Sequence, residues 1–547
     1  REGDAIVLYQ RNQDTDNVTN KMVFKGNIER ITDRDIRIRL RASQQNASVL
    51  PLESHYAIEH DYMDTSFRSM YLGLSAFLSA NKDRRDLLLS QREPEFDTSF
   101  DARIAAASND FSRITLKAQA ARDYFLLIGP PGTGKTSRAL RGMVEAFYRE
   151  GKQILLLSYT NRAVDEICKT LSVITPEIDF IRIGSELSCD PPFRSRLIEN
   201  VLEACSTRRE VHACIEGCRV FVGTVATFSS KTDMFRLKTF DVAIVDEATQ
   251  ILEPQLLGLL CARDVAGNNA IGKFILIGDH KQLPAVVLQS ESQSEVCEEC
   301  LQSIGLYNLK DSLFERLYRT VSADHSSPTT QRFYDMLCRQ GRMNVEVAQF
   351  PNRAFYGGLL EAVGLPHQQG KLVLAPGLES DEFADILVHR VAFLPSVPET
   401  PSQSAKINHF EARLTARLAA SVYRQYEASN SGFNSALTLG VITPYRSQIA
   451  LIKREIAALG IPVLNDILVD TVERFQGSER DVIIYSFCVN RTYQLKFLAN
   501  LTEEKGVWID RKLNVALTRA RKQLFMTGVP HLLRQNPIYA DLLDTVL

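Results

Sequence analysis

A glycine-rich stretch, GPPGTGKT, occupies residues 129–136 of the 547-residue sequence. It follows the apolar run FLLI and precedes a segment with the apolar spacing of a helix. Its glycines, which let backbone amides approach phosphate oxygens without a side-chain clash, are Gly129, Gly132 and Gly134. Lys135 would place its charge on the β- and γ-phosphates, and Thr136 would offer a hydroxyl to Mg²⁺. The stretch therefore predicts a loop that binds a nucleoside triphosphate.

Two further stretches place acidic and amide groups at the ends of apolar runs. In DVAIVDEATQ, Asp246 would hold Mg²⁺, and Glu247 would orient and deprotonate the attacking water. In FILIGDHKQLPAVV, Asp279 and Gln282 would sense the γ-phosphate. A guanine-specific NKxD stretch does not occur where a GTPase would have it. Together these features favour ATP, with Mg²⁺, as the nucleotide.

The order of hydrophobic patterns along the chain predicts an α/β protein with several domains. Residues 1–61 contain short alternating runs typical of a small β-barrel, and residues 62–100 have the helical spacing of a stalk. Farther on, near-continuous apolar runs alternate with helical segments, which suits parallel sheets covered by helices on both faces. We expect one α/β domain at 101–323, with a helical insertion at about 169–219, and a second at 324–547.

Composition narrows the class of protein but does not choose its partner. The sequence is 45% hydrophobic and 24% charged, and no stretch approaches the ~20 apolar residues of a membrane helix. A net charge of -2 neither requires nor excludes nucleic acid. Ten cysteines in so long a chain favour a reducing, cytoplasmic or nuclear location. The chain begins at Arg1 and not at Met, so we allow for an upstream segment, for example a nuclease domain.

Two groups of cysteines raise the question of a structural zinc site. One group is Cys297 and Cys300, and the other consists of Cys205, His212, Cys214 and Cys218. Zinc sites usually pair two such groups at a defined spacing. These two groups are far apart in the sequence and neither is a clean set of four ligands. We therefore favour free cysteines on helices over a zinc site.

Six ordered stretches resemble the motifs of superfamily 1 helicases. GPPGTGKT, VDEATQ and GDHKQLPA are similar to motifs I, II and III, and they are followed by VITPYRSQI, DTVERFQGSERDVII and LNVALTRARKQLFMTG. The similarity is to the 1B branch that holds the nonsense-mediated-decay RNA helicase and the replication nuclease-helicase. SAKINHFEA matches the same branch. The resemblance implies two tandem RecA-like domains behind a β-barrel and stalk.

The resemblance assigns roles to positions that the spacing alone does not. It makes Gln119 the reader of the adenine edge, and it makes Arg342 and Arg519 arginine fingers that reach across the cleft between the two domains. Gly477 and Glu479 would touch the γ-phosphate and the ribose. A planar, permanent cation suits the charge that spreads in the transition state. Because the fingers would come from the second domain, hydrolysis would depend on closure of the two domains.

One position departs from the family pattern. The family usually has Gln-Tyr-Arg-Met around the first finger, and its tyrosine stacks on adenine. Here the stretch is RQGRMN, with Gly341 in the place of the tyrosine. We therefore expect this chain to use nucleotides more broadly than its tyrosine-bearing relatives.

The resemblance also implies a path for a single strand across both domains, along the edges where the strands end. Hydroxyls, amides and a few basic groups would hold its phosphates. The residues are Thr160, Asn161, Thr224 and Thr227 in the first domain and Pro444, Tyr445, Arg446 and Thr471 in the second. Taken singly, each Ser or Thr could equally cap a helix.

The function that these features favour is an ATP-dependent helicase or translocase on single-stranded nucleic acid, DNA rather than RNA. The resemblance implies 5′→3′ polarity. A second hypothesis is a nucleotide-gated clamp, or an RNA helicase, with little unwinding. A nuclease within this chain has little support, because no compact Asp…Glu-x-Lys constellation is visible.

Overall fold

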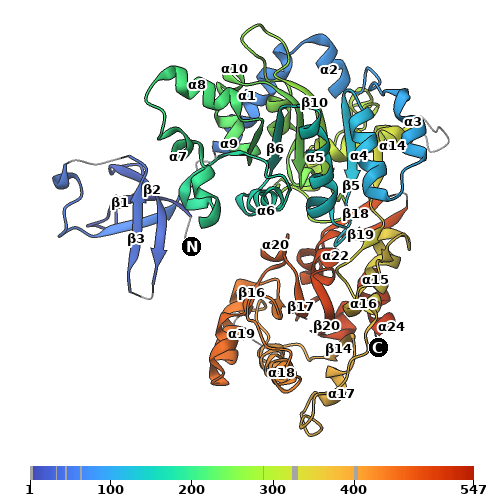
Figure 1. Ribbon diagram of the computed structural model, residues 1–547. Coiled ribbons are helices and arrows are strands. Elements are labelled where there is room, and N and C mark those ends of the chain that lie inside the picture. Colours follow the sequence, from blue (N-terminus) through green and yellow to red (C-terminus); the bar gives the residue numbers. More distant parts are fainter. Residues whose placement is uncertain are drawn as a thin grey trace.

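The computed structural model describes residues 4–32, 34–42, 46–61, 65–287, 289–322, 330–399, 404–504 and 506–546. Within these ranges the chain forms a small antiparallel sheet and two larger parallel sheets with helices around them (Figure 1). This arrangement confirms the predicted α/β class with two tandem parallel sheets, which fit RecA-like domains. We call residues 110–336 the first unit and residues 339–546 the second unit.

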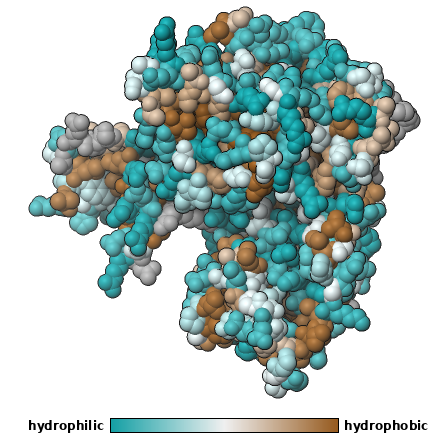
Figure 2. All heavy atoms as spheres, in the orientation of Figure 1, coloured by the Kyte–Doolittle hydropathy of each residue, from teal (hydrophilic) through white to brown (hydrophobic). Residues whose placement is uncertain are grey.

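The N-terminal sheet has the order β3-β2-β1-β4, and all of its pairs are antiparallel. Its strands are β1 (Ala5–Gln10), β2 (Val23–Ile31), β3 (Ile36–Leu40) and β4 (Tyr56–His60). They confirm the short alternating strands expected within residues 1–61. No pair between β3 and β4 joins the described residues, so the closed barrel stays a prediction. Figure 2 shows apolar residues over this sheet, at the left of the view.

Two helices connect the N-terminal sheet to the first unit. They are α1 (Thr65–Ser79) and α2 (Lys82–Leu88). The first packs against α11 (Glu253–Leu260) with backbones almost in contact, since a Cβ on Gly73 would lie 2.3 Å from the Pro254 carbonyl oxygen. Helix α1 is thus fixed to the first unit. Its predicted start at residue 62 lies outside the described residues.

The first sheet has the order β11-β5-β10-β9-β6-β8-β7 in the described ranges, with every pair parallel. Its strands are β5 (Tyr124–Ile128), β6 (Ile154–Ser158), β7 (Ile181–Ile183), β8 (Val220–Thr224), β9 (Phe240–Asp246), β10 (Ile271–Gly278) and β11 (Tyr334–Met336). Most of their residues are buried, as near-continuous apolar runs require when helices cover both faces. Because the strands are parallel, their carboxyl ends form one edge.

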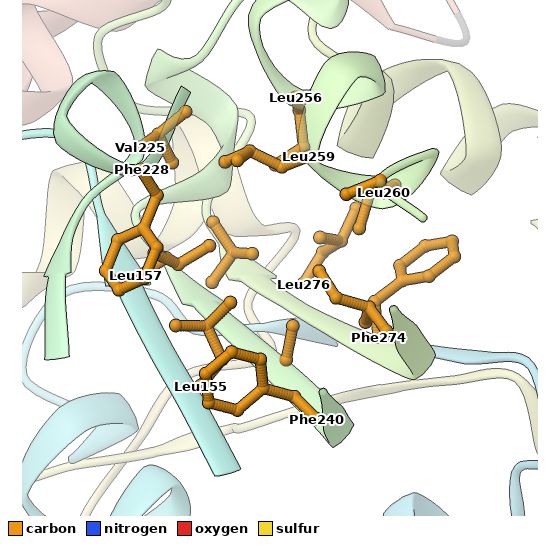
Figure 3. Close-up of a cluster of buried hydrophobic side chains, with 14 of the residues drawn as sticks. Leu155, Leu157, Val225, Phe228, Phe240, Leu256, Leu259, Leu260, Phe274 and Leu276 are labelled. Carbon is orange, nitrogen blue, oxygen red and sulfur yellow. The ribbon is translucent and has the colours of Figure 1, made fainter. Parts of the chain in front are cut away.

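Helices cover both faces of this sheet, and none in the described ranges is long and apolar enough to cross a membrane. They are α3 (Asp101–Ala105), α4 (Asp110–Ala120), α5 (Arg141–Arg149), α6 (Asn161–Ser172), α7 (Ile198–Leu202), α8 (Arg208–Gly217), α9 (Val225–Ser230), α10 (Met234–Leu237), α11, α12 (Glu291–Ser294), α13 (Glu299–Gln302) and α14 (Leu313–Ser322). Figure 3 shows side chains of α9 and α11 packed onto β6, β9 and β10, with Phe228, Leu259 and Phe274 among them.

Two edge strands correct the predicted organisation of this unit. The insertion expected at 169–219 contains helices α7 and α8, but β7 within it pairs with β8 and extends the sheet. The domain boundary expected at 323/324 lies outside the described residues, yet β11 beyond it pairs with β5. Both strands have only three residues, too few for a period to show in the sequence.

The second sheet has the order β14-β20-β17-β15-β16, again parallel throughout. Its strands are β14 (Val391–Pro395), β15 (Leu439–Ile442), β16 (Leu468–Asp470), β17 (Arg480–Ser486) and β20 (Ala520–Gly528). Two short pairs lie outside it: β12 (Arg339–Gln340) with β13 (Glu361–Ala362), and β18 (Leu501–Glu504) with β19 (Val507–Asp510). The β18–β19 hairpin was not predicted.

Helices again flank the sheet. They are α15 (Val345–Tyr356), α16 (Pro366–Gln369), α17 (Ala384–Leu387), α18 (His409–Ala428), α19 (Arg446–Ala458), α20 (Val472–Phe475), α21 (Leu495–Leu498), α22 (Arg511–Leu517), α23 (Pro530–Leu533) and α24 (Pro537–Val546). Helix α22 lies at the side of the second unit that faces the first unit in Figure 1. Figure 2 shows the molecular surface hollowed between the units on the left of the view.

Candidate active site between the two units

The glycine-rich loop follows the carboxyl end of β5 and has the backbone its glycines permit. Gly132 and Gly134 have φ angles of 73° and 81°, a region that favours glycine. Gly129 donates its N–H to the Gly278 carbonyl at 2.9 Å, and a Cβ on it would meet the Lys135 side chain at 2.7 Å. A helical segment starts at Lys135 and continues into α5. The loop thus precedes a helix N-terminus, the arrangement that binds phosphates.

The predicted phosphate and metal groups contact one another. Lys135 Nζ lies 2.8 Å from Glu247 Oε1, and Thr136 Oγ1 donates to Asp246 Oδ2 at 2.6 Å. Asp246 is the last residue of β9 and Glu247 follows it, and β10 lies between β9 and β5 in the sheet. A lysine, a hydroxyl and a carboxylate at one loop fit a triphosphate with Mg²⁺, which usually takes few protein ligands and the substrate's own phosphates.

Burial and the charge on Glu247 raise the pKa of Asp246 to about 6. Burial opposes the charged form of Glu247 as well, but the neighbouring Lys135 ammonium outweighs it and lowers the pKa of Glu247. Gln250 donates to Glu247 at 3.0 Å and adds to this effect. Glu247 is therefore ionised, as a general base must be, and its charge is balanced by the lysine.

The groups after β10 lie in a network shared with the second unit. Gln282 Nε2 donates to Asp279 Oδ2 at 2.8 Å, and the Tyr356 hydroxyl of α15 donates to the same oxygen at 2.7 Å. Arg519 donates to Gln282 Oε1 at 3.4 Å. Sequence reasoning missed Tyr356, because nothing in the spacing of α15 marks it.

Arg519 is buried, and its guanidinium is held by carbonyls. It donates to the carbonyls of Val515 and Ser478 at 3.1 and 3.3 Å. Burial, together with the nearby Arg342 cation, lowers the pKa of Arg519 to about 9. The structure thus brings this predicted finger to Gln282, in the same site as Glu247.

Arg342 lies against the loop and pairs with a predicted ribose-binding residue. A Cβ on Gly132 would lie 2.4 Å from the Arg342 Cβ, so the two backbones are in close contact. Arg342 Nε donates to Glu479 Oε2 at 2.6 Å. Burial opposes ionisation of Glu479, but Arg342 outweighs it and lowers the pKa of that carboxyl. Gly477, with φ 73°, lies in the turn just before Glu479.

Further contacts between the units surround this network, and sequence reasoning found none of them. The Asn514 amide donates to the Lys281 carbonyl at 2.7 Å, and Arg511 pairs with Glu315 at 2.5 Å. Glu504, on the β18–β19 hairpin, lies 3.2 Å from His280. Contacts on several sides hold the units together in this conformation.

The structure corrects the position of Gln119. Its amide donates to Glu150, just past the end of α5, whereas the phosphate loop precedes the helical run that starts at Lys135. At ~1.5 Å per helical residue, the two are about 20 Å apart. Gln119 lies shortly before β5, and the loop follows β5, so they lie at opposite edges of the sheet. Gln119 cannot read the adenine edge from there.

The start of α4, not its end, faces the loop. The Arg138 guanidinium, in the helical turn after the loop, lies 5.7 Å from the centre of the Phe111 ring.

Gly341 donates its N–H to the Gly132 carbonyl at 2.8 Å. A Cβ on Gly341 would meet only ordinary contacts, with Leu365 at 3.4 Å and Val363 at 3.5 Å. Neither backbone conformation nor crowding therefore requires a glycine at 341.

The predicted nucleic-acid residues of the first unit lie at the carboxyl edge of the first sheet. Ser158 of β6 pairs in register with Thr224 of β8, so Thr160 and Thr224 follow neighbouring strand ends. The Thr160 hydroxyl caps α6, which begins at Asn161, and the Thr224 hydroxyl caps α9 by accepting from the Thr227 N–H at 3.1 Å. The Thr224 and Thr227 hydroxyls also lie 2.8 Å apart. The hydroxyls of Thr160 and Thr224 thus act as helix caps, and their contact with phosphates stays a prediction.

The corresponding residues of the second unit lie at the carboxyl edge of the second sheet. Ile442 of β15 is level with Asp470 of β16, so the segments that follow these strands are neighbours. Pro444, Tyr445 and Arg446 follow β15, and Thr471 follows β16. The Tyr445 hydroxyl accepts a bond from Gln494 at 3.1 Å.

The predicted cysteine groups form no candidate metal centre. In the described ranges, no three His, Cys, Asp or Glu side chains are grouped to hold a metal ion. Cys297 and Cys300 are exposed, and burial raises the pKa of Cys214 and Cys218.

Two family models, both described as AAA domain, match the chain. One matches residues 309–531, and the other matches 107–213 together with 199–290. Their boundaries place the glycine-rich loop in one match and Arg519 in the other.

Curated relatives match three quarters of the chain or more. The DNA replication ATP-dependent helicase/nuclease JHS1 of Arabidopsis thaliana is 28% identical over 100% of this chain and 38% of its own length. DNA2 of Bos taurus is 28% identical over 98% and 48%. DNA2 of Xenopus laevis, a protein with the same description, is 32% identical over 76% and 36%. The chain thus spans less than half the length of these relatives.

Solved structures of a viral helicase align more weakly. The arterivirus nonstructural protein 10 helicase covers 76% of this chain and 61% of its own, with 14% identity and a TM-score of 0.34. Its complex with DNA has a TM-score of 0.35 with 13% identity, over 77% of this chain and 63% of its own. Scores this low do not compare folds in detail. Together, the ordered motifs, the two AAA-domain matches and the curated relatives place this chain in the superfamily 1B helicases, in the branch of the replication helicase/nucleases.

Proposed function

We propose that this chain is an ATP-dependent, 5′→3′ helicase or translocase on single-stranded nucleic acid, with DNA preferred over RNA. The observation that carries the proposal is the contact of Arg519, from the second unit, with Gln282, from the first. Gln282 lies in a site with Lys135, Asp246 and Glu247. A cation that stabilises charge in phosphoryl transfer is thus supplied across the boundary between the two units.

In the proposed site, each residue has a role that its position supports. Lys135 and the loop amides would bind phosphate oxygens, and Thr136 and Asp246 would hold Mg²⁺, which would neutralise charge on the phosphates. Glu247 orients the attacking water and takes its proton, while Gln282 contacts the γ-phosphate. Arg342 and Arg519 stabilise the spread charge, and Gly477 and Glu479 lie at the ribose.

Motion follows from the division of the site between two units. Phosphate binding would separate Lys135 from Glu247. The lysine would then contact the phosphates, and the carboxylate would contact the attacking water. Closure and reopening of the units would then move the two carboxyl edges relative to each other. A strand held by Thr160, Asn161, Thr224 and Thr227 on one edge and by Pro444, Tyr445, Arg446 and Thr471 on the other would advance with each cycle.

The finer parts of the proposal rest on family resemblance. The relatives are named for DNA replication and for combined helicase and nuclease activities, which supports DNA and a nuclease partner domain. The proposed 5′→3′ polarity is inferred from the resemblance to the 1B branch of superfamily 1 helicases. The N-terminal sheet, as part of a barrel, and α1 would contact the duplex ahead of the strand. A nuclear or cytoplasmic location stays a prediction.

The test is ATP hydrolysis with and without single-stranded DNA or RNA, beside displacement of a duplex with a 5′ or 3′ overhang. We expect DNA to stimulate hydrolysis more than RNA, and displacement only from a 5′ overhang. Stimulation without displacement would favour the nucleotide-gated clamp instead. Hydrolysis indifferent to both nucleic acids would contradict the proposal.

A further inference from the structure

Large apolar side chains are exposed on the segment between β17 and α22. Tyr493, Phe497 and Trp508 are 56%, 65% and 55% exposed, and Leu501 is 47% exposed. The rings of Tyr493 and Phe497 contact edge to face, with centroids 6.5 Å apart. Exposed aromatic groups of this density usually mark a binding surface.

The β18–β19 hairpin directs its exposed side chains to one face. Leu501 pairs in register with Asp510, and Glu503 pairs with Trp508, so Leu501 and Trp508 share a face of the hairpin. Glu504, on the other face, pairs with His280 of the first unit. Just after the hairpin, Lys512 Nζ of α22 donates to the Phe497 carbonyl of α21 at 3.4 Å. The aromatic segment, residues 491–504 and 506–510, is thus held by contacts at Glu504 and Phe497.

This aromatic segment continues the proposed nucleic-acid edge. It follows the carboxyl end of β17, and β17 pairs with β15, whose carboxyl end leads to Tyr445. Gln494, between the two ring-bearing residues Tyr493 and Phe497, donates to the Tyr445 hydroxyl at 3.1 Å. Gln494 also accepts from the N–H of Asn490 at 2.9 Å. The segment is therefore held rigidly beside a residue already proposed to contact the strand.

The charges around the aromatic segment suit a strand whose bases face it. Arg491 and Lys496 are exposed, and in the described ranges neither has a carboxylate partner. Glu503, directly across from Trp508, would repel a phosphate but can accept hydrogen bonds from base amino groups. Bases rather than backbone therefore belong over the tryptophan. Stacking on aromatic side chains contributes about 1–3 kcal/mol per base and tolerates any sequence.

We propose that Tyr493, Phe497 and Trp508 form a base-stacking platform for the single strand, beyond Tyr445 on the carboxyl edge of the second sheet. The proposal rests on the proposed function, since it extends the path of the same strand. The strand would cross from the hydroxyl-lined edge onto the aromatic segment, and there its bases would stack while Arg491 and Lys496 contact its phosphates.

The test uses the fact that Trp508 is the only tryptophan of the sequence. Tryptophan emission of the whole chain is followed as an oligo-dT strand is added, and binding is measured separately by anisotropy of a labelled strand. We expect emission to be quenched by the base-bearing strand and unchanged by an abasic strand of equal length that binds through its phosphates. A Trp508→Phe variant, which removes the signal, assigns it.

A pair of variants measures the contribution to binding. Tyr493→Ala with Phe497→Ala should weaken binding of oligo-dT by about tenfold or more, since one stacked base is worth about that much. Tyr307→Ala, which removes an aromatic ring 51% exposed between α13 and α14, is the matched control and should leave binding unchanged. Basal ATP hydrolysis should stay the same in Tyr307→Ala.

The outcomes separate the two proposals. If the unaltered chain binds no strand, the proposed function fails. If it binds the strand while tryptophan emission and the affinity of the double variant stay unchanged, the proposed function stands. The platform is then overturned, and the aromatic segment is better read as a docking face for a protein.

Discussion

The two ends of the nucleotide site are built differently. At the phosphate end, Lys135 pairs with Glu247 within the first unit, and Arg519 of the second unit donates to Gln282 of the first. At the base end, Gly341 presents no side chain, and Gln119 lies at the opposite edge of the sheet. Several contacts therefore position the groups proposed for hydrolysis, whereas few groups are placed to select the base.

This difference teaches where substitutions should matter. Arg519 has partners in both units, so its loss should change both the charge of the site and the closure of the units. A residue at the base end contacts its surroundings through ordinary packing, so that its change should alter preference rather than rate. The predictions below run from the phosphate end to the base end.

Replacement of Arg519 should have the largest effect. Arg519→Ala removes the buried cation beside Gln282, and we expect kcat for ATP to fall by about 10³-fold, because arginine fingers contribute that much or more. The measurement is steady-state hydrolysis with single-stranded DNA present, with circular dichroism to check folding. Arg534→Ala, at a surface arginine paired with Asp544, is the control and should keep full activity. A folded Arg519 variant within tenfold of the original would refute the assignment.

Glu247→Gln should lower kcat by about 10²-fold while nucleotide binding survives. The substitution removes the general base, and it also releases Lys135 from its ion pair, so that ATP should bind as tightly or more tightly. Hydrolysis is measured beside the affinity for a fluorescent nucleotide. Activity that persists in the variant would overturn Glu247 as the base, and a loss of affinity would show that the ion pair does not compete with phosphate.

Gly341→Tyr should increase the preference for ATP over the other nucleoside triphosphates. The original chain should hydrolyse ATP, GTP, CTP and UTP with similar kcat/KM. The backbone accepts a side chain at 341, and an added ring would stack on the base, for about a 2- to 10-fold gain in the preference for ATP. A strong preference for ATP in the original chain, equal to that of tyrosine-bearing relatives, would contradict the comparison.

Gln119→Ala should have the smallest effect of all. Because the Gln119 amide bonds to Glu150 at the far edge of the sheet, KM for ATP should stay within about twofold, the scatter expected of surface changes. A Phe111→Ala variant, at the start of α4 near Arg138, tests the end of the helix that does face the loop. A clear rise in KM for Gln119→Ala alone would restore its predicted role.

The sequence could predict most of the fold because the pattern of each element is local. Apolar runs such as FLLI and ILLLS are long enough to show buried strands, and the glycine and lysine spacing of the loop fits one backbone shape. The sequence did not predict strands β7 and β11, because three residues are too few to show an alternation of apolar and polar side chains. The β18–β19 hairpin escaped because polar and charged residues dominate its first strand.

The sequence by itself determined the chemistry: which residue types are present, in which order, and at the end of which strand. Only the tertiary structure decided which of them meet. Tyr356 reaches Asp279, and Arg519 reaches Gln282, through packing between units that are distant in the chain. Gln119 was misplaced for the same reason, since sequence distance from the loop does not say at which edge of the sheet a residue lies. Contacts of this kind depend on which edge of a parallel sheet faces the neighbouring unit. No local sequence pattern specifies which edge that is.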